Sequence, residues 1–379
     1  MMKDRLNATL YQAKRSQIRQ FSQMARQTPG CIALTLGEPD FDTPDAICEE
    51  VPAALAEGKT HYIENNGRRD LREAIACYER VHCGMDYAAD EVIVTAGATQ
   101  GLFTALFSIL NPGDEVIVPT PAFLLYEDIT GMCRGKFVPL NTSDDGFQID
   151  PEKLNALINE HTKAIVLNTP NNPTGTILNE DSLKSVHDAV IGKEIFVICD
   201  DVYRQIVYTG NYHSFTEFHD LREQIILVQS FSKPYAMTGW RMGYLCADAS
   251  VIDRMQLAHS VTITSTPAMF QDAAIKALET DPSGMLKQYQ RRRDLMVRRI
   301  SEIGLDMTEP EGAFYVFPRT DRFGMTSAEF CTRLIKEAGV GGTPGQSFGD
   351  DRFIRFSYAA SDDMLAEAMN RLERFIRSL

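Results

Sequence analysis

The chain has 379 residues, of which 44% are hydrophobic and 24% are charged, and its 52 Asp and Glu residues against 38 Lys and Arg residues give a formal net charge of −14. A chain of this length can bury a large core without disulfides or metal ions, so we expect a full-sized globular protein. The acidic balance argues against broad binding to a nucleic-acid backbone, which needs clustered Lys and Arg, and no nucleic-acid partner is expected.

The cysteines and the N-terminal segment bear on the compartment. Eight scattered cysteines form no CxxC pair and no Cys/His cluster of zinc-like spacing, so we expect free thiols, no metal site and a cytoplasmic location. No apolar run approaches the roughly 20 residues of a membrane span. The first 21 residues are basic and lack the apolar core of a signal peptide, so neither anchoring nor export is expected. Residues 1–30 are instead expected to form a helical arm that is part of the fold.

From residue 91 onward, short runs rich in Val and Ile alternate with helix-like segments, which predicts an α/β fold with a mostly parallel sheet of seven strands. Helices are predicted between the strands, for example over 98–110 and 151–160. The last two runs are too close for a helical crossover, so we expect the seventh strand to be antiparallel. The seven runs are 91–97, 114–121, 135–141, 163–170, 195–201, 225–232 and 241–248.

Beyond about residue 283 the pattern changes to a long charged helix, the segment PEGAFYVFP, another helical piece and DDRFIRFSYA. These elements predict a second, smaller α+β domain. We expect residues 1–40 to form an arm and part of the small domain, 41–283 a large domain, and 284–379 the small C-terminal domain. The gap between two such domains is a common place for a ligand.

Polar residues and a helix start follow several of the predicted strands at their carboxyl ends, where ligands bind in open α/β sheets. They are Ala98 and Thr99 after the first run, Asn172 after the fourth, Asp200 and Tyr203 after the fifth, and Ser230, Ser232, Lys233 and Arg241 after the sixth. The helix start at Ala98 offers free N–H groups to an anion such as phosphate. A carboxylate after a buried strand needs a cation or strong donor, and a lysine between hydroxyls and an arginine suits a Schiff-base amine beside an anion site. A flat cationic heterocycle that carries a phosphate and an aldehyde would satisfy the whole set.

This set of motifs resembles the class I and II aminotransferases of the fold type I pyridoxal-phosphate (PLP) family, in the aspartate and aromatic aminotransferase group. The resemblance spans nearly the whole chain, and it implies PLP as cofactor, a homodimer with shared active sites, and transfer of an amino group from an L-amino acid to a 2-oxo acid. Eight blocks carry it: LGEPDFDTP (36–44), HYIENNGRRDLREAI (61–75), TAGATQGL (95–102), TPNNPTGT (169–176), CDDVYRQIVY (199–208), SFSKPYAMTGWRMGY (230–244), PEGAFYVFP (310–318) and RFIRFSYA (352–359).

The resemblance implies roles for the residues around the cofactor ring. Lys233 would form the Schiff base with PLP and then move the substrate proton, and Asp200 would keep the pyridine nitrogen protonated. Tyr203 and Asn172 would hydrogen-bond the phenolic oxygen of the ring. Phe123 would stack on the ring face.

It also implies how the phosphate and the substrate are bound. Arg355 would grip the substrate α-carboxylate with a two-point fork, together with Gly37 and Asn172. Tyr62 would reach the phosphate from the neighbouring subunit. The other phosphate ligands would be Ser230, Ser232, Arg241 and the N–H groups of Ala98 and Thr99.

The amino donor and the reaction type stay open at this point. Relatives that act on aspartate or prephenate often carry a lysine where this chain has the neutral Thr99, so the donor is either a neutral or aromatic amino acid or aspartate. Its side chain is expected to meet residues around 10–21 and the opposite subunit. The alternative is a PLP-dependent C–S β-lyase similar to cystathionine β-lyase, because the same cradle supports elimination.

Two other classes are disfavoured. The effector-binding domain of a transcription regulator would follow a DNA-binding module, and only about 35 residues precede LGEPD. A nicotinamide dehydrogenase would carry a dinucleotide fingerprint after a strand, and GATQG lacks that spacing.

Overall fold

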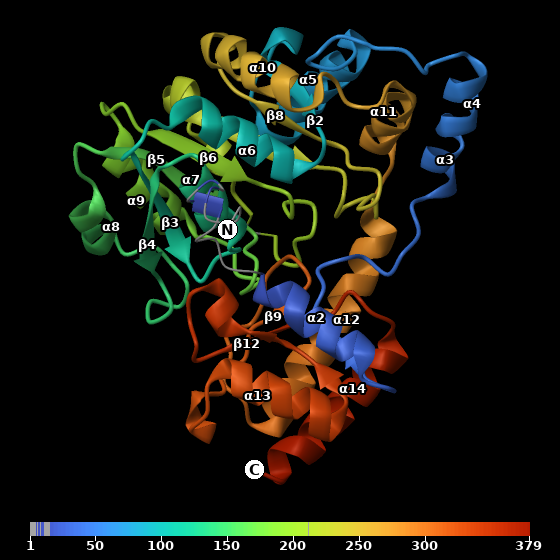
Figure 1. Ribbon diagram of the computed structural model, residues 1–379, viewed down its shortest axis with the longest axis vertical. Coiled ribbons are helices and arrows are strands. Elements are labelled where there is room, and N and C mark those ends of the chain that lie inside the picture. The colour runs from blue at the N-terminus through green and yellow to red at the C-terminus, as the bar shows by residue number, and fades with distance from the viewer. Residues whose placement is uncertain (1–4, 6, 8, 11–15, 211) are drawn as a thin grey trace.

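The computed structural model describes residues 5, 7, 9, 10, 16–210 and 212–379 (Figure 1). Its larger part contains a seven-stranded sheet in the order β2-β8-β7-β6-β5-β3-β4, in which β8 is antiparallel to both neighbours and the other pairs are parallel. The seven predicted strands and the antiparallel last one are therefore confirmed. The strands are β2 Val92–Thr95, β3 Glu115–Thr120, β4 Lys136–Asn141, β5 Thr162–Asn168, β6 Phe196–Asp200, β7 Ile225–Ser230 and β8 Gly243–Cys246.

Helices cover both faces of this sheet, which explains why its central strands are continuous apolar runs: all six residues of β7 are buried. One face packs against α5 (Arg69–Cys83), α8 (Pro151–Leu157), α9 (Glu180–Val190) and α11 (Gln271–Glu279). The other face packs against α6 (Ala98–Ile109), α7 (Leu125–Met132) and α10 (Ala249–Ile263). The short helices α3 (Asp45–Cys48) and α4 (Glu50–Ala56) lie at the edge of this part in Figure 1.

The predicted helix over 98–110 corresponds to α6, and the predicted helix over 151–160 is shorter than expected. Asp150 caps the start of α8 by accepting from the N–H groups of Glu152 and Lys153. The helix ends at Leu157 because Ile158 has extended backbone angles.

The smaller part holds a three-stranded antiparallel sheet in the order β11-β12-β9 and a parallel pair of β1 with β10. The N-terminal helix α2 (Gln17–Gln27) packs among the C-terminal elements, where Phe21 and Ala25 join their hydrophobic cluster (Figure 1). The division expected at residues 40 and 283 stays a prediction. The remaining elements are β1 Ile32–Ala33, α12 Ser283–Ile303, β9 Tyr315–Val316, α13 Ser327–Arg333, the π-helical turn Leu334–Ala338, β10 Val340–Gly341, β11 Thr343–Pro344, β12 Ile354–Ser357 and α14 Asp362–Arg377.

Among the helices that the structure describes, none combines the length and the apolar character that crossing a membrane requires.

Candidate active site

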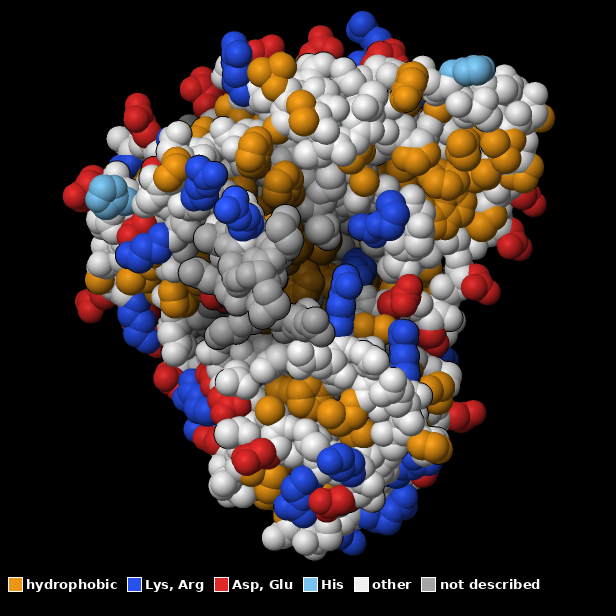
Figure 2. Space-filling view, in the orientation of Figure 1, with side chains coloured by type: hydrophobic (Ala, Val, Ile, Leu, Met, Phe, Trp, Pro, Cys, Tyr) orange, Lys and Arg blue, Asp and Glu red, His pale blue; other side chains and the backbone are white. Residues whose placement is uncertain are grey.

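A cavity of about 290 Å³ lies where the carboxyl ends of β5, β6 and β7 meet side chains from β9, β12 and α2. Figure 2 shows the molecule hollowed at this junction, between its larger upper and smaller lower part. All the predicted site residues except Tyr62 line the cavity: Gly37, Ala98, Thr99, Phe123, Asn172, Asp200, Tyr203, Ser230, Ser232, Lys233, Arg241 and Arg355. Tyr62 lies outside it and is 89% exposed.

Lys233 follows β7 in the turn that leads to β8, and its side chain is partly buried. Its Nζ donates a hydrogen bond to the carbonyl oxygen of Gly37 at 2.5 Å. Burial lowers the pKa of Lys233 to about 8; the Glu38 carboxylate opposes that shift, and the cations Arg355 and Arg241 add to it. An amine with this pKa is partly in its neutral form near physiological pH, and the neutral form is the nucleophile.

Asp200 is the last residue of β6 and is buried. The hydroxyl of Tyr126 donates to its Oδ2 at 2.7 Å, and the side-chain amide of Asn168 donates to its backbone oxygen at 2.8 Å. Its Oδ1 has no hydrogen-bond partner among the described residues. Burial raises the pKa of Asp200 to about 7, against the hydrogen bond from Tyr126. The carboxylate therefore lacks one strong donor, and a cationic N–H in the cavity would supply it.

Arg355 lies in β12 and is 2% exposed, with its guanidinium between the rings of Tyr315 (4.6 Å to the centroid) and Phe348 (4.8 Å). Its Nη1 donates to Asn172 Oδ1 at 2.8 Å and its Nη2 donates to the carbonyl oxygen of Thr35 at 2.5 Å. Its buried Nε has no partner within the described chain. The planar fork is thus held in one orientation with a donor to spare, which suits a carboxylate.

Tyr203 and Asn172 stand between these groups. The hydroxyl of Tyr203 lies 2.8 Å from that of Tyr315, and both side chains are buried. The backbone N–H of Asn172 donates to Asn168 Oδ1 at 3.0 Å, which fixes the loop after β5.

A possible anion-binding surface lies where α6 begins, opposite the end of β7. The hydroxyl of Ser230 lies 2.9 Å from that of Ser232, and Arg241 donates through Nη1 to the carbonyl oxygen of Thr238 at 2.8 Å. Gly97 precedes the helix with φ of +76°, and a Cβ there would lie 2.6 Å from Arg241 Nη2, so a glycine is needed. N–H groups at a helix start, two hydroxyls and a guanidinium are the kinds of donor that bind a phosphate in proteins.

Sequence reasoning missed several residues that line the cavity, among them three with side-chain hydrogen bonds to Asp200 or Tyr203. Tyr126 and Asn168 contact Asp200, and Tyr315 contacts Tyr203. Asn168 and Tyr315 lie in segments that were recognised as site-forming, but the contacts of their side chains could not be foreseen. Tyr126 lies in the apolar segment after PTPAF and carried no signal of its own.

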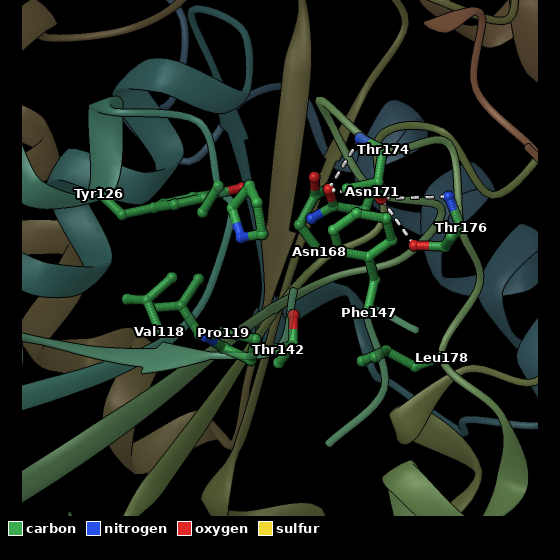
Figure 3. Close-up of a pocket in the computed structure, with 13 residues that line it drawn as sticks. Val118, Pro119, Tyr126, Thr142, Phe147, Asn168, Asn171, Thr174, Thr176 and Leu178 are labelled. Carbon is green, nitrogen blue, oxygen red and sulfur yellow. Dashed lines mark hydrogen bonds between the residues drawn. The ribbon is translucent and has the colours of Figure 1, made fainter. Parts of the chain in front are cut away.

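Tyr126 and Asn168 also line a second, small cavity of about 20 Å³ behind the first. Figure 3 shows Tyr126 on one side of it and Asn168 with Asn171 on the other. This volume holds about one water molecule, and the polar side chains in its mixed lining offer that molecule partners. Thr142, Thr174 and Thr176 also line this cavity, and the hydroxyl oxygens of Thr174 and Thr176 are 2.6 Å apart.

In the described part of the chain, His, Cys, Asp and Glu side chains do not gather in threes or more at a spacing that could hold a metal ion.

Comparison with known proteins agrees with this geometry. A family model described as "Aminotransferase class I and II" matches residues 29–372. The chain is 40% identical over 371 residues to an aspartate aminotransferase of Pyrococcus horikoshii, covering 95% of this chain and 94% of that protein. It is 37% identical over 375 residues to aromatic-amino-acid aminotransferase 2 of Thermococcus litoralis, covering 96% of each. The crystal structure of an aspartate aminotransferase from Thermotoga maritima superposes with a TM-score of 0.95 at 33% identity, covering 98% of this chain and 100% of that one.

Proposed function

The chain belongs to the class I and II aminotransferase family, and on that premise we propose that it uses PLP to move an amino group from an L-amino acid to a 2-oxo acid. One observation carries the proposal. The amine of Lys233, the unpartnered carboxylate oxygen of Asp200 and the guanidinium of Arg355 line a single cavity.

The residues present fit PLP at each of its functional groups. Lys233 would hold the aldehyde end, and Asp200 Oδ1 would accept from the protonated ring nitrogen. The surface at the start of α6, with Ser230, Ser232 and Arg241, would bind the phosphate. When bound, PLP supplies an electron sink for the negative charge that develops at the substrate Cα.

The protein's own groups would then carry out the proton transfer. Arg355 binds the α-carboxylate of the substrate and sets the direction in which the Cα–H bond points. The Lys233 amine, free once the substrate is bound, would take the proton from the substrate Cα and deliver it to C4′, the former aldehyde carbon of the cofactor. Tyr203 and Asn172 would hydrogen-bond the phenolic oxygen of the ring, and Phe123 would lie against the ring face.

The described wall of the cavity suits a neutral or aromatic donor, and aspartate stays the alternative. Its cations are Lys233, Arg241 and Arg355, each of which has a role above, and within the described lining there is no fourth cation for a second carboxylate. The lining residues left for a donor side chain are Ile18, Leu36, Leu125 and the neutral Thr99.

We also propose a homodimer in the cytoplasm, with Tyr62 serving the partner's site. Its phenol is 89% exposed and lies outside the cavity of its own chain, which supports that role. A C–S β-lyase remains the alternative reaction on this cradle, and the named relatives, which are aminotransferases, favour transfer.

The test is the binding of PLP and the first half of the reaction. The purified chain with PLP should absorb in the visible range, lose that band with an amino donor and regain it with 2-oxoglutarate or pyruvate. Lys233→Ala should abolish both changes, while Lys184→Ala, an exposed lysine on α9, should leave them intact. A wild-type chain that binds no PLP would contradict the proposal. Release of ammonia and pyruvate from cystathionine without these changes would favour the lyase.

A further inference from the structure

Tyr126 stands directly behind the carboxylate of Asp200. It is the second residue of α7, is 1% exposed, and its hydroxyl donates to Asp200 Oδ2 at 2.7 Å. Burial and the neighbouring Asp200 raise the pKa of Tyr126 well above its usual value, so the phenol stays a neutral donor. A neutral donor stabilises the carboxylate without cancelling its charge.

The hydrogen bond divides the two oxygens of Asp200 between two tasks. Oδ2 is engaged by Tyr126, whereas Oδ1 finds no partner in the described residues. Asn168 holds the backbone oxygen of Asp200 at 2.8 Å, so the main chain is fixed independently and Tyr126 fixes the side chain. The free oxygen is therefore presented in one orientation.

Ionisation of Asp200 also depends on Tyr126. Burial raises the pKa of Asp200, and the hydrogen bond from Tyr126 is the largest effect in the opposite direction. The Coulomb attraction of Lys233 acts in the same direction as Tyr126 but is a smaller effect. Loss of the hydroxyl would thus make the carboxylate more basic.

We propose that Tyr126 is a positioning residue for amino-group transfer, whose hydroxyl aims Asp200 Oδ1 at the cofactor's ring nitrogen and keeps the shared proton on that nitrogen. The inference rests on the proposed function. The hydrogen bond from the Tyr126 hydroxyl to the Asp200 carboxylate is charge-assisted, and such bonds are short and strong.

The same residue has a packing role that the test must separate. The ring of Tyr126 belongs to the hydrophobic cluster under α6 and α7, with Leu102 and Ile129. Tyr126→Phe keeps the ring and removes only the hydroxyl. Tyr87→Phe is a matched control, because Tyr87 is equally buried and its hydroxyl has no hydrogen-bond partner among the described atoms.

The experiment is nitrogen-15 NMR of the purified holoenzyme loaded with PLP that is labelled at the ring nitrogen, together with kcat. In Tyr126→Phe the signal should move from the protonated toward the neutral pyridine position, since a more basic Asp200 draws the proton. We expect kcat to fall about tenfold to a hundredfold, the size of a lost hydrogen bond to a charged group. Tyr87→Phe should change neither quantity, and the melting temperatures of both variants check their folding.

A double-mutant cycle tests whether Tyr126 acts through Asp200. In an Asp200→Asn background, Tyr126→Phe should lower kcat by less than about twofold, because the carboxylate that it serves is gone. An equal loss of kcat in both backgrounds would refute the inference, as would an unchanged nitrogen signal in Tyr126→Phe. A wild-type chain that holds no PLP would refute the proposed function as well, so the two failures can be told apart.

Discussion

Replacement of Arg355 by lysine tests the substrate site with the charge retained. The guanidinium is fixed by Asn172 and Thr35 and lies between two aromatic rings, and its Nε is unpartnered in the described structure. A lysine at this position keeps one positive charge but loses the planar fork. The variant therefore separates two-point binding of a carboxylate from simple attraction to it.

The magnitude follows from the hydrogen bonds that lysine cannot make. A fork offers two charge-assisted hydrogen bonds to a carboxylate, each worth about 1.5–3 kcal/mol, and an ammonium group retains one of them at best. Lysine also cannot serve Asn172 Oδ1 and the Thr35 carbonyl at once, and an unpaired buried acceptor costs about 1–3 kcal/mol. The one lost hydrogen bond lowers kcat/KM by roughly ten- to 150-fold, since about 1.4 kcal/mol is a factor of ten, and the unpaired acceptor lowers the stability of the fold instead.

The assay measures each half of the reaction alone. Single-turnover rates are followed by the absorbance of the bound cofactor, first with an amino donor and then with a 2-oxo acid. Both rates should fall by a similar factor because both substrates carry the same α-carboxylate. The affinity for PLP should stay within about twofold of wild type, as Arg355 has no role toward the phosphate or the ring nitrogen.

Arg352→Lys is the matched control. Arg352 lies three residues earlier, but it pairs with Asp350 at 2.7 Å and Asp144 at 2.6 Å and does not line the cavity. It should leave kcat/KM unchanged. If Arg355→Lys has no effect on either half-reaction, or affects only the donor, Arg355 is not the carboxylate site and the reasoning above fails.

Two further predictions follow from the geometry of the site. A Cβ at Gly37 would lie 1.8 Å from the hydroxyl oxygen of Tyr315, so Gly37→Ala should lower kcat at least about tenfold, and adding Tyr315→Phe should restore part of the lost activity. The control is Gly284→Ala, because no atom lies within 4 Å of a Cβ at Gly284. A kcat for Gly37→Ala equal to that of wild type would contradict the prediction. The pKa of Asp200 is about 7 in the folded PLP-free chain and about 3.9 in the unfolded chain. Between these two pH values the folded chain binds more protons than the unfolded chain, so its stability falls as the pH rises. Asp200→Asn should therefore resist urea better than wild type at pH 8, with a smaller advantage at pH 5; an advantage independent of pH would show that ionisation of Asp200 is not its cause.

Much of the fold could be predicted because the central strands of the large sheet are buried on both faces. Each appears as an apolar run, and the runs over 195–201 and 225–232 became β6 and β7 with ends shifted by one or two residues. The shift arises because polar residues after the strand, such as Asp201, were counted in the run. Their place at the carboxyl ends also brought the site residues together, as the parallel sheet requires.

The contacts behind the site could not be predicted, for a physical reason. Tyr126 and Asp200 are 74 positions apart, and their hydrogen bond depends on how α7 docks on the sheet at the end of β6. The residue pattern around Tyr126 does not indicate where its hydroxyl lies. Tyr315 likewise reaches Tyr203 only because β9 pairs with β12 on the opposite side of the cavity.

Two buried polar atoms without hydrogen-bond partners in the described structure explain why ligand binding should stabilise the fold. Asp200 Oδ1 and Arg355 Nε are buried in one cavity, and neither has a partner among the described residues. A buried polar atom of this kind that is left without a partner costs about 1–3 kcal/mol, which selection for stability alone would remove. The cost is recovered only by a molecule that brings a cationic donor to Asp200 and a carboxylate to Arg355. PLP, which would pair with Asp200, and a carboxylate analogue of the substrate, which would pair with Arg355, should each raise the melting temperature. Because they act on separate groups, the two increases should add.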